Sequence, residues 1–171
     1  GEFILCTIHR DSNTDKPEHL NQIIRGLLQI QQISNQVLVL PLHPRTRKKM
    51  TELLEPAVAE ELQDNSRIQV IDPAGFLDMI SLESRCSMVI TDSGGVQKEA
   101  FFFKKPCIIL REQTEWVEIV ENGNALLVGS NEEKLIEAYN QLTTKKDYTY
   151  PPFFGDGHAS EEICRLMLEH L

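Results

Sequence analysis

Short, wholly apolar runs recur along the chain, and this pattern most strongly limits the fold that it can adopt. Six runs of four to six residues are rich in Val, Ile and Leu and are apolar at successive positions. They are Phe3–Ile8, Val37–Leu42, Ile68–Ile71, Met88–Thr91, Cys107–Leu110 and Ala125–Val128. A strand with one wet face alternates apolar and polar residues, whereas a strand buried on both faces does not. The runs therefore predict a parallel sheet with helices on both faces.

Longer segments with helical periodicity separate these runs. In Leu20–Ile33 the apolar residues recur every three or four positions, as on one face of an α-helix. The other predicted helices are Thr46–Leu62, Gly75–Ser84, Gly94–Phe103, Thr114–Glu121, Asn131–Leu142 and Ala159–His170. Regular alternation of strands and helices implies right-handed crossovers. We therefore expect one α/β domain over residues 1–171, built on a doubly wound parallel sheet of about six strands.

The segment 143–157 interrupts this alternation. It carries two tyrosines, two phenylalanines and a Pro-Pro pair, and it lacks helical periodicity. Proline favours extended backbone at the residue before it. The segment is therefore predicted to cross the domain in an extended form and to lead into the last helix.

Charge and cysteine content limit the classes of partner. The chain has 17 Lys and Arg against 26 Asp and Glu, a net charge of −9, which argues against a nucleic-acid or membrane surface. No apolar stretch reaches the ~18 residues that a membrane span needs. Three of the four cysteines lie in or beside apolar runs and none forms a C-x-x-C pair. They predict reduced thiols in a cytoplasmic protein, with no metal site.

Ligands of doubly wound sheets bind beyond the carboxyl ends of the strands. The loop after the fourth run reads Ser93-Gly94-Gly95. Two glycines predict a tight turn that lets an anion approach the first amides of the next helix, and the Ser93 hydroxyl serves either the anion or the helix cap. Glu99 lies one turn further on the same face and suits a vicinal diol such as that of ribose. A tight turn followed by a solvated glutamate explains these residues equally well.

Polar side chains follow three other runs. They are His9 and Arg10 after the first run, His43 after the second, and Arg111 after the fifth with Glu115 in the next helix. Imidazole exchanges a proton near neutral pH, and guanidinium binds phosphate through two hydrogen bonds. Taken singly, each is also explained as a surface charge or a helix-start residue. Because parallel strands end at one edge, these loops should converge, and their convergence predicts a site for a phosphorylated ligand.

A set of motifs with fixed order and spacing runs through these loops. They are Thr7-x-His9-Arg10, His43-Pro44, Asp92-Ser93-Gly94-Gly95-x-Gln97-x-Glu99, Arg111-x-x-Thr114-Glu115, Asn124-x-Leu126-x-Val128-Gly129 and Phe154-Gly155-Asp156-Gly157. With these motifs the chain resembles the carboxyl-terminal half of the UDP-N-acetylglucosamine 2-epimerase family over essentially its whole length. The resemblance implies a GT-B-like enzyme of two domains, with the active site in the cleft between them and the amino-terminal domain absent from this chain.

The resemblance implies inversion at C2 of the sugar, which interconverts UDP-GlcNAc and UDP-ManNAc without a cofactor. UDP is eliminated to leave a 2-acetamidoglucal and then re-adds to the other face. His9 would lie near the sugar–phosphate linkage and help the phosphate to leave, because elimination builds negative charge on the departing UDP. In the same comparison Arg10 and His43 match positions of a regulatory UDP-GlcNAc site found in some bacterial members.

The resemblance also assigns residues to the substrate. Ser93, Gly94 and Gly95 would hold the diphosphate, and Glu99 would hold the ribose hydroxyls. The remaining assignments are Ala74 and Met79 for the uracil, and Arg111 and Glu115 for the phosphate or sugar region. The full-length enzyme is expected to be a homodimer that takes no nucleic-acid or membrane partner.

Two departures from the family pattern leave the sugar open. Trp116 stands where many members have arginine, and Ser12 stands where the first motif usually has glutamate. Both changes are closer to relatives that act on UDP-2,3-diacetamido uronic acid sugars. A hydrolysing 2-epimerase, the donor half of a GT-B glycosyltransferase and a non-catalytic binding module are further alternatives. Because the family's proton-shuttling carboxylates lie on the other half, the isolated chain is expected not to epimerise and to bind UDP weakly at best.

Overall fold

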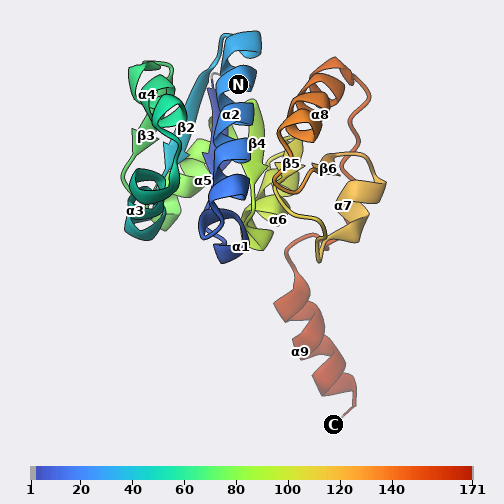
Figure 1. The fold of residues 1–171 in the computed structure, drawn as a ribbon. Helices are drawn as coiled ribbons and strands as arrows, with labels where there is room; N and C mark the ends of the chain where they lie inside the picture. The colour runs from blue at the N-terminus through green and yellow to red at the C-terminus, as the bar shows by residue number, and fades with distance from the viewer. Residues whose placement is uncertain (1–2, 171) are drawn as a thin grey trace.

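A computed structural model describes residues 3–170 and contains a six-stranded, wholly parallel sheet (Figure 1). Its strands are β1 (Phe3–Thr7), β2 (Val37–Pro41), β3 (Ile68–Ile71), β4 (Met88–Thr91), β5 (Cys107–Ile109) and β6 (Ala125–Leu127). The spatial order is β3-β2-β1-β4-β5-β6, so the winding reverses between β1 and β4. The predicted doubly wound, Rossmann-like sheet and all six predicted strands are confirmed.

Register places the ends of the two central strands side by side. Thr7, the last residue of β1, pairs with Thr91, the last residue of β4. Their hydroxyl oxygens are 2.6 Å apart. The loops that follow β1 and β4 therefore leave the sheet next to each other at the switch point, where such sheets bind ligands.

Helices cover both faces of the sheet. They are α1 (Asp11–Thr14), α2 (Pro17–Ser34), α3 (Pro44–Leu53), α4 (Pro56–Asp64), α5 (Phe76–Arg85), α6 (Gly94–Phe102), α7 (Val117–Glu121), α8 (Glu132–Thr144) and α9 (Ala159–Glu169). One apolar core joins the sheet to α2, α3, α4 and α8, and a second joins it to α5, α6 and α7. Helices α2 and α8 lie side by side (Figure 1), with Gly26 of α2 leaving room for the side chain of Leu135. No helix in the described part of the chain is long and apolar enough to cross a membrane.

The structure corrects two predicted helices and adds a third that the sequence did not predict. The single helix predicted over Thr46–Leu62 is wrong, because α3 ends at Leu53 and α4 begins at Pro56. Proline disfavours helical backbone at the preceding residue, and Glu55 is accordingly extended at φ −61° and ψ 141°. The helix predicted over Thr114–Glu121 begins only at Val117, because the Thr114 hydroxyl accepts the Trp116 backbone N–H at 3.1 Å. The short helix α1 was not predicted.

The segment between α8 and α9 follows the predicted extended course. Asn122 and Asn124 both donate side-chain N–H bonds to the Thr149 carbonyl at 2.8 Å, which ties the segment to the β6 edge. Phe154 then packs on the second core, on the face of the sheet opposite α8. The last helix, α9, stands apart from the body (Figure 1), and its large apolar side chains are exposed.

Candidate functional site

A buried aspartate, Asp92, holds together the two loops at the switch point. It follows β4 directly and its side chain is 0% exposed. Its carboxylate accepts the backbone N–H of His9 at 3.1 Å and that of Arg10 at 3.0 Å. It also accepts hydrogen bonds from Nδ1 of His9 at 2.6 Å and from Nδ2 of Asn13 at 3.0 Å. The Arg10 Nε donates to the Asp92 carbonyl at 2.9 Å. These hydrogen bonds join the segment after β1 to the loop after β4.

The same contacts set the charge of the site. The hydrogen bond that His9 donates to Asp92 raises the pKa of His9 above its ordinary value, against the opposing effect of partial burial. Burial alone would raise the pKa of Asp92, but the hydrogen bonds from His9 and from the Arg10 amide outweigh it, and that pKa is lowered. Asp92 engages Nδ1, while the His9 side chain remains 53% exposed. The second ring nitrogen, Nε2, is therefore the one that can donate a proton or a hydrogen bond to a ligand.

Next to this pair, the start of α6 offers backbone amides. Ser93 is the N-cap residue, and its hydroxyl accepts the Val96 N–H at 3.5 Å. Neither Gly94 nor Gly95 has a positive φ, so the short turn from β4 into α6 does not use the left-handed backbone that favours glycine. The missing side chain of Gly94 matters instead, because a Cβ there would lie 3.3 Å from Glu115 Oε2. The first amides of a helix have no intrahelical acceptor and favour an anion.

An ion pair lies against this helix start. Arg111 donates to both carboxylate oxygens of Glu115 at 2.7 and 2.8 Å, and the guanidinium side chain is 12% exposed. The hydrogen bond from Arg111 lowers the pKa of Glu115 to about 2. Both residues were predicted to contact the ligand separately, whereas the structure joins them. An incoming phosphate would share Arg111 with Glu115.

The single tryptophan braces the same turn from behind. Trp116 Nε1 donates to the Gly94 carbonyl at 2.7 Å, and its ring packs on the second core. The Lys98 ammonium lies 4.7 Å from the centres of both the Trp116 and the Phe154 rings. These contacts make Trp116 a packing residue that supports the start of α6.

The other predicted residues lie on separate elements at the same edge. Ala74 is in the loop between β3 and α5, Met79 is half-buried in the first turns of α5, and Glu99 is half-buried on α6. His43 caps α3, and its Nδ1 accepts the Arg45 N–H at 3.3 Å. The structure therefore gives His43 the helix-start role, and does not join it to the Asp92 network.

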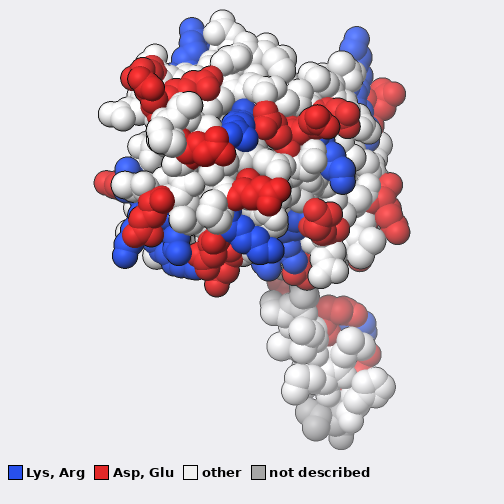
Figure 2. Space-filling model, viewed as in Figure 1, with Lys and Arg blue, Asp and Glu red and all other residues white. Residues whose placement is uncertain are grey.

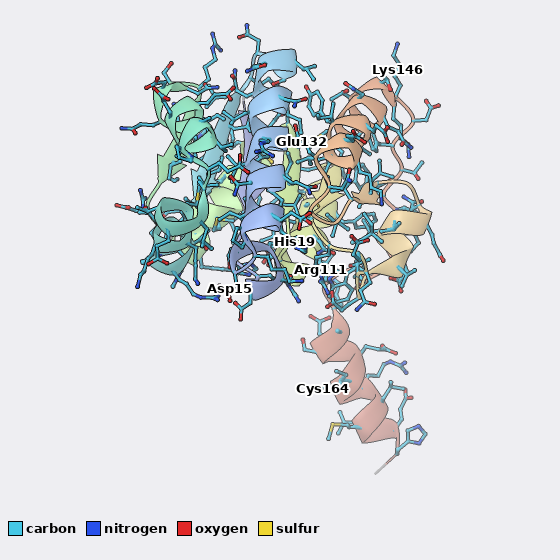
Figure 3. The ribbon with its side chains drawn as sticks, in the orientation of Figure 1. Asp15, His19, Arg111, Glu132, Lys146 and Cys164 are labelled. Atoms are coloured by element: carbon cyan, nitrogen blue, oxygen red, sulfur yellow. The ribbon has the colours of Figure 1, made fainter. Side chains whose placement is uncertain are left out.

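A pocket of about 290 Å³ opens between the loops that follow β1, β5 and β6. Its lining includes Arg10, Asn13, His19, Arg111, Gly129 and Ser130. His19 and Arg111 lie at this edge in Figure 3. On the face seen in Figure 2, acidic and basic side chains intermingle, so the net charge of −9 does not form one acidic field there. Residues 3–170 contain no group of three or more His, Cys, Asp or Glu side chains arranged to hold a metal ion.

Two residues at this site were given no role by the sequence. In the sequence, Asp92 was placed only within a motif, and Asn13 was not singled out. Asn13 donates from one amide nitrogen to both Asp92 and the Leu110 carbonyl, the latter at 2.9 Å. An aspartate immediately after a buried strand, at the predicted switch point, was the available signal.

A six-stranded parallel α/β sheet with this strand order belongs to the class of Rossmann-like domains. The sequence profile of the UDP-N-acetylglucosamine 2-epimerase family matches residues 1–168. The chain belongs to that family.

Individual relatives agree with this assignment. The chain is 46% identical over 165 residues to the UDP-2,3-diacetamido-2,3-dideoxy-D-glucuronate 2-epimerase of Pseudomonas aeruginosa. That match covers 96% of this chain and 44% of the relative. The chain is 41% identical over 166 residues to a UDP-N-acetylglucosamine 2-epimerase homolog of Methanococcus maripaludis, which covers 97% of this chain and 44% of the relative. The chain thus spans less than half the length of the curated relatives it matches.

A solved structure has the same fold. It is the UDP-GlcNAc 2-epimerase of Methanocaldococcus jannaschii in complex with UDP-GlcNAc and UDP, at 39% identity and a TM-score of 0.85. The match covers 98% of this chain and 45% of that one.

Proposed function

We propose that this chain is the UDP-binding half of a 2-epimerase that interconverts UDP-GlcNAc and UDP-ManNAc in the cytoplasm without a cofactor. The observation that carries the proposal is the placement of the His9 ring beside the start of α6, fixed by Asp92. That placement puts a protonatable nitrogen next to amides that favour a diphosphate. The related M. jannaschii enzyme, whose structure is a complex with UDP-GlcNAc and UDP, supports the same ligand class.

In the proposed reaction, the diphosphate lies on the amides of Gly94 and Gly95 and near the Ser93 hydroxyl. A base on the other domain removes the C2 proton, the bond from C1 to the phosphate oxygen breaks, and UDP leaves with the bonding electrons. His9 supports this step from Nε2, because positive charge and a hydrogen bond stabilise the oxygen on which negative charge develops. Re-addition of UDP and return of the proton to the opposite face complete the inversion.

The nucleoside would lie across α5 and α6. Ala74 and Met79 would contact the uracil, and Glu99 would accept hydrogen bonds from the ribose hydroxyls. Arg111 would reach the phosphate or sugar while it remains paired with Glu115. Arg10 lies in the Asp92 network and lines the neighbouring pocket, and any regulatory role for it and for His43 would use the same edge of the sheet.

A second substrate deserves a direct test. The P. aeruginosa relative at 46% identity is named for a UDP-2,3-diacetamido uronic acid sugar, and Trp116 and Ser12 depart from the common family pattern. We therefore propose UDP-2,3-diacetamido-2,3-dideoxyglucuronate as the alternative substrate of the same mechanism.

The test has two arms. In calorimetry, the chain is expected to bind UDP weakly, and Glu99→Ala should weaken binding about tenfold further, as the loss of charged hydrogen bonds to a diol predicts. In NMR, the chain combined with the amino-terminal half of a relative should exchange the C2 proton of one of the two sugars with solvent, whereas the chain alone should not. Absence of UDP binding would refute the nucleotide site. Release of free N-acetylmannosamine, or transfer to an added acceptor without C2 exchange, would replace the epimerase by a hydrolysing enzyme or a glycosyltransferase.

A further inference from the structure

A buried glutamate, Glu83, lies on α5 behind the proposed nucleoside site. It is 1% exposed, and neither of its carboxylate oxygens has a hydrogen-bond partner among residues 3–170. An ionised carboxylate buried without a donor is strongly unfavourable, so such a group keeps its proton or needs a partner. Glu83 takes no part in the Asp92 network and needs another explanation.

The charged side chain that acts on Glu83 from the neighbouring helix is Glu99, the predicted ribose-binding residue. Helix α5 packs against α6, and burial together with the negative charge of Glu99 raises the pKa of Glu83 to about 8. At the end of α5, the Cys86 thiol donates a hydrogen bond to the Glu83 backbone carbonyl at 3.2 Å. Burial raises the pKa of that thiol, and the positive charge of Lys105, in the loop after α6, opposes the rise. Strand β1, which also packs on α5, contributes apolar side chains to this core.

Position along α5 links the pair to the nucleoside. Glu83 follows Met79 by four residues, one helical turn, so both lie on the face of α5 that joins the second core. Met79 is assigned to the uracil and Glu99 to the ribose. Glu83 therefore lies under the junction between the two parts of the proposed nucleoside site.

We propose that Glu83 is a positioning residue for nucleotide binding: its protonated carboxyl donates to Glu99 and directs the free Glu99 oxygen toward the ribose diol. This inference rests on the proposed function, in which Glu99 accepts the ribose hydroxyls. A neutral carboxyl has one O–H, which can occupy one Glu99 oxygen and leave the other as an acceptor. When Glu83 loses its proton, the two carboxylates repel and Glu99 turns away from the diol.

The test is UDP affinity as a function of pH, measured by calorimetry on the chain. A group with a pKa near 8 is about nine-tenths ionised at pH 9, so the Kd of the wild-type protein should rise about tenfold between pH 7 and pH 9. Glu83→Gln keeps a neutral donor at every pH, and its Kd should change by less than about twofold. Glu60→Gln, at an exposed position on α4, is the matched control and should follow the wild type. Ionisation of the uracil affects all three proteins equally.

A second variant and a measurement on the ligand-free protein test the role of Glu83 independently. Glu83→Met has no donor, so at pH 7 it should bind UDP about as weakly as the wild type does at pH 9. Its UDP affinity should not fall further as the pH is raised. Carboxyl carbon NMR of the free protein should show one glutamate titrating near pH 8, absent from Glu83→Met and shifted to lower pH in Glu99→Gln.

The outcomes separate the two proposals. UDP binding that is independent of pH in the wild type, or that falls equally in Glu83→Gln, overturns the positioning role and leaves the UDP site intact. A Glu83 resonance that titrates in the ordinary carboxyl range also overturns it. Failure of the wild type to bind UDP at pH 7 overturns the proposed function, and the role of Glu83 with it.

Discussion

The switch point and helix α9 are the two extremes of this molecule. At the switch point, Asp92 accepts hydrogen bonds from His9, Arg10 and Asn13, which are separated from it by 79 to 83 positions in the sequence. Along α9, all residues are exposed and the ion pairs are local, such as those of Arg165 with Glu162 and Glu169. The conformation of the switch point depends on contacts between distant parts of the chain, whereas that of α9 depends on contacts within the helix. Function requires the first kind of order, because a ligand site needs side chains held at fixed distances.

The largest effect is expected for Asp92→Asn. An amide offers one acceptor oxygen and places its own N–H groups against the donors of Arg10 and Asn13, so buried donors lose their partners. We expect the free energy of unfolding to fall by about 2–4 kcal/mol. UDP binding should be lost with it, because the His9 ring is released.

Chemical denaturation and UDP calorimetry test this expectation. Asp64→Asn, at an exposed position on α4, is the control and should leave both measurements unchanged. A stability change for Asp92→Asn no larger than that of the control would show that the network does not hold the loops together.

The contrast between the two regions also explains what the sequence could reveal. Buried strands have a local signature, and the runs Met88–Thr91 and Cys107–Leu110 predicted β4 and β5 closely. The role of Asp92 depends on which strands are neighbours, and strand order has no local signature. The pairing of Arg111 with Glu115 depends likewise on rotamers that spacing alone does not fix.

A smaller effect is expected for Trp116→Phe. The substitution keeps the aromatic packing against Phe154 and removes the Nε1 bond to the Gly94 carbonyl. One lost neutral hydrogen bond predicts a fall of about 1 kcal/mol in the free energy of unfolding. Since that bond holds the start of α6, UDP affinity should also fall several-fold.

Tyr148→Phe is the matched control for this variant. It removes a bond of similar length, from the Tyr148 hydroxyl to the Leu142 carbonyl at 2.6 Å, at the end of α8 rather than at the start of α6. Its stability loss should be similar, with UDP affinity unchanged. Equal affinities for the two variants would refute the bracing role of Trp116.

The His9–Asp92 pair predicts a modest dependence of stability on pH. The pKa of His9 is raised on folding, so its contribution is complete below its unfolded value of 6.5 and is lost as pH rises through the folded value. The pKa of Asp92 is lowered, so its contribution is present above 3.8 and is lost as pH falls through the folded value. Stability from this pair should therefore be greatest between about pH 4 and pH 6.5.

Denaturation at pH 6 and pH 8 measures the His9 part. Because the ring is half-exposed, water screens the interaction, and we expect the wild type to lose only about 0.5 kcal/mol over this interval. His9→Gln should lose none of it. An equal loss in both proteins would assign the pH dependence to other groups.

The smallest effect is expected at the other extreme, for removal of residues 159–171. Because α9 buries none of its residues, its deletion costs the body no apolar contact, and the free energy of unfolding should change by less than about 0.5 kcal/mol. Deletion from residue 145 onward is the matched comparison, because it also removes Thr149 and Phe154, which contact the β6 edge and the second core. That longer deletion should destabilise the body by several-fold more. If both deletions cost the same large amount, α9 packs on the body in solution, and the distinction between the two regions fails at that helix.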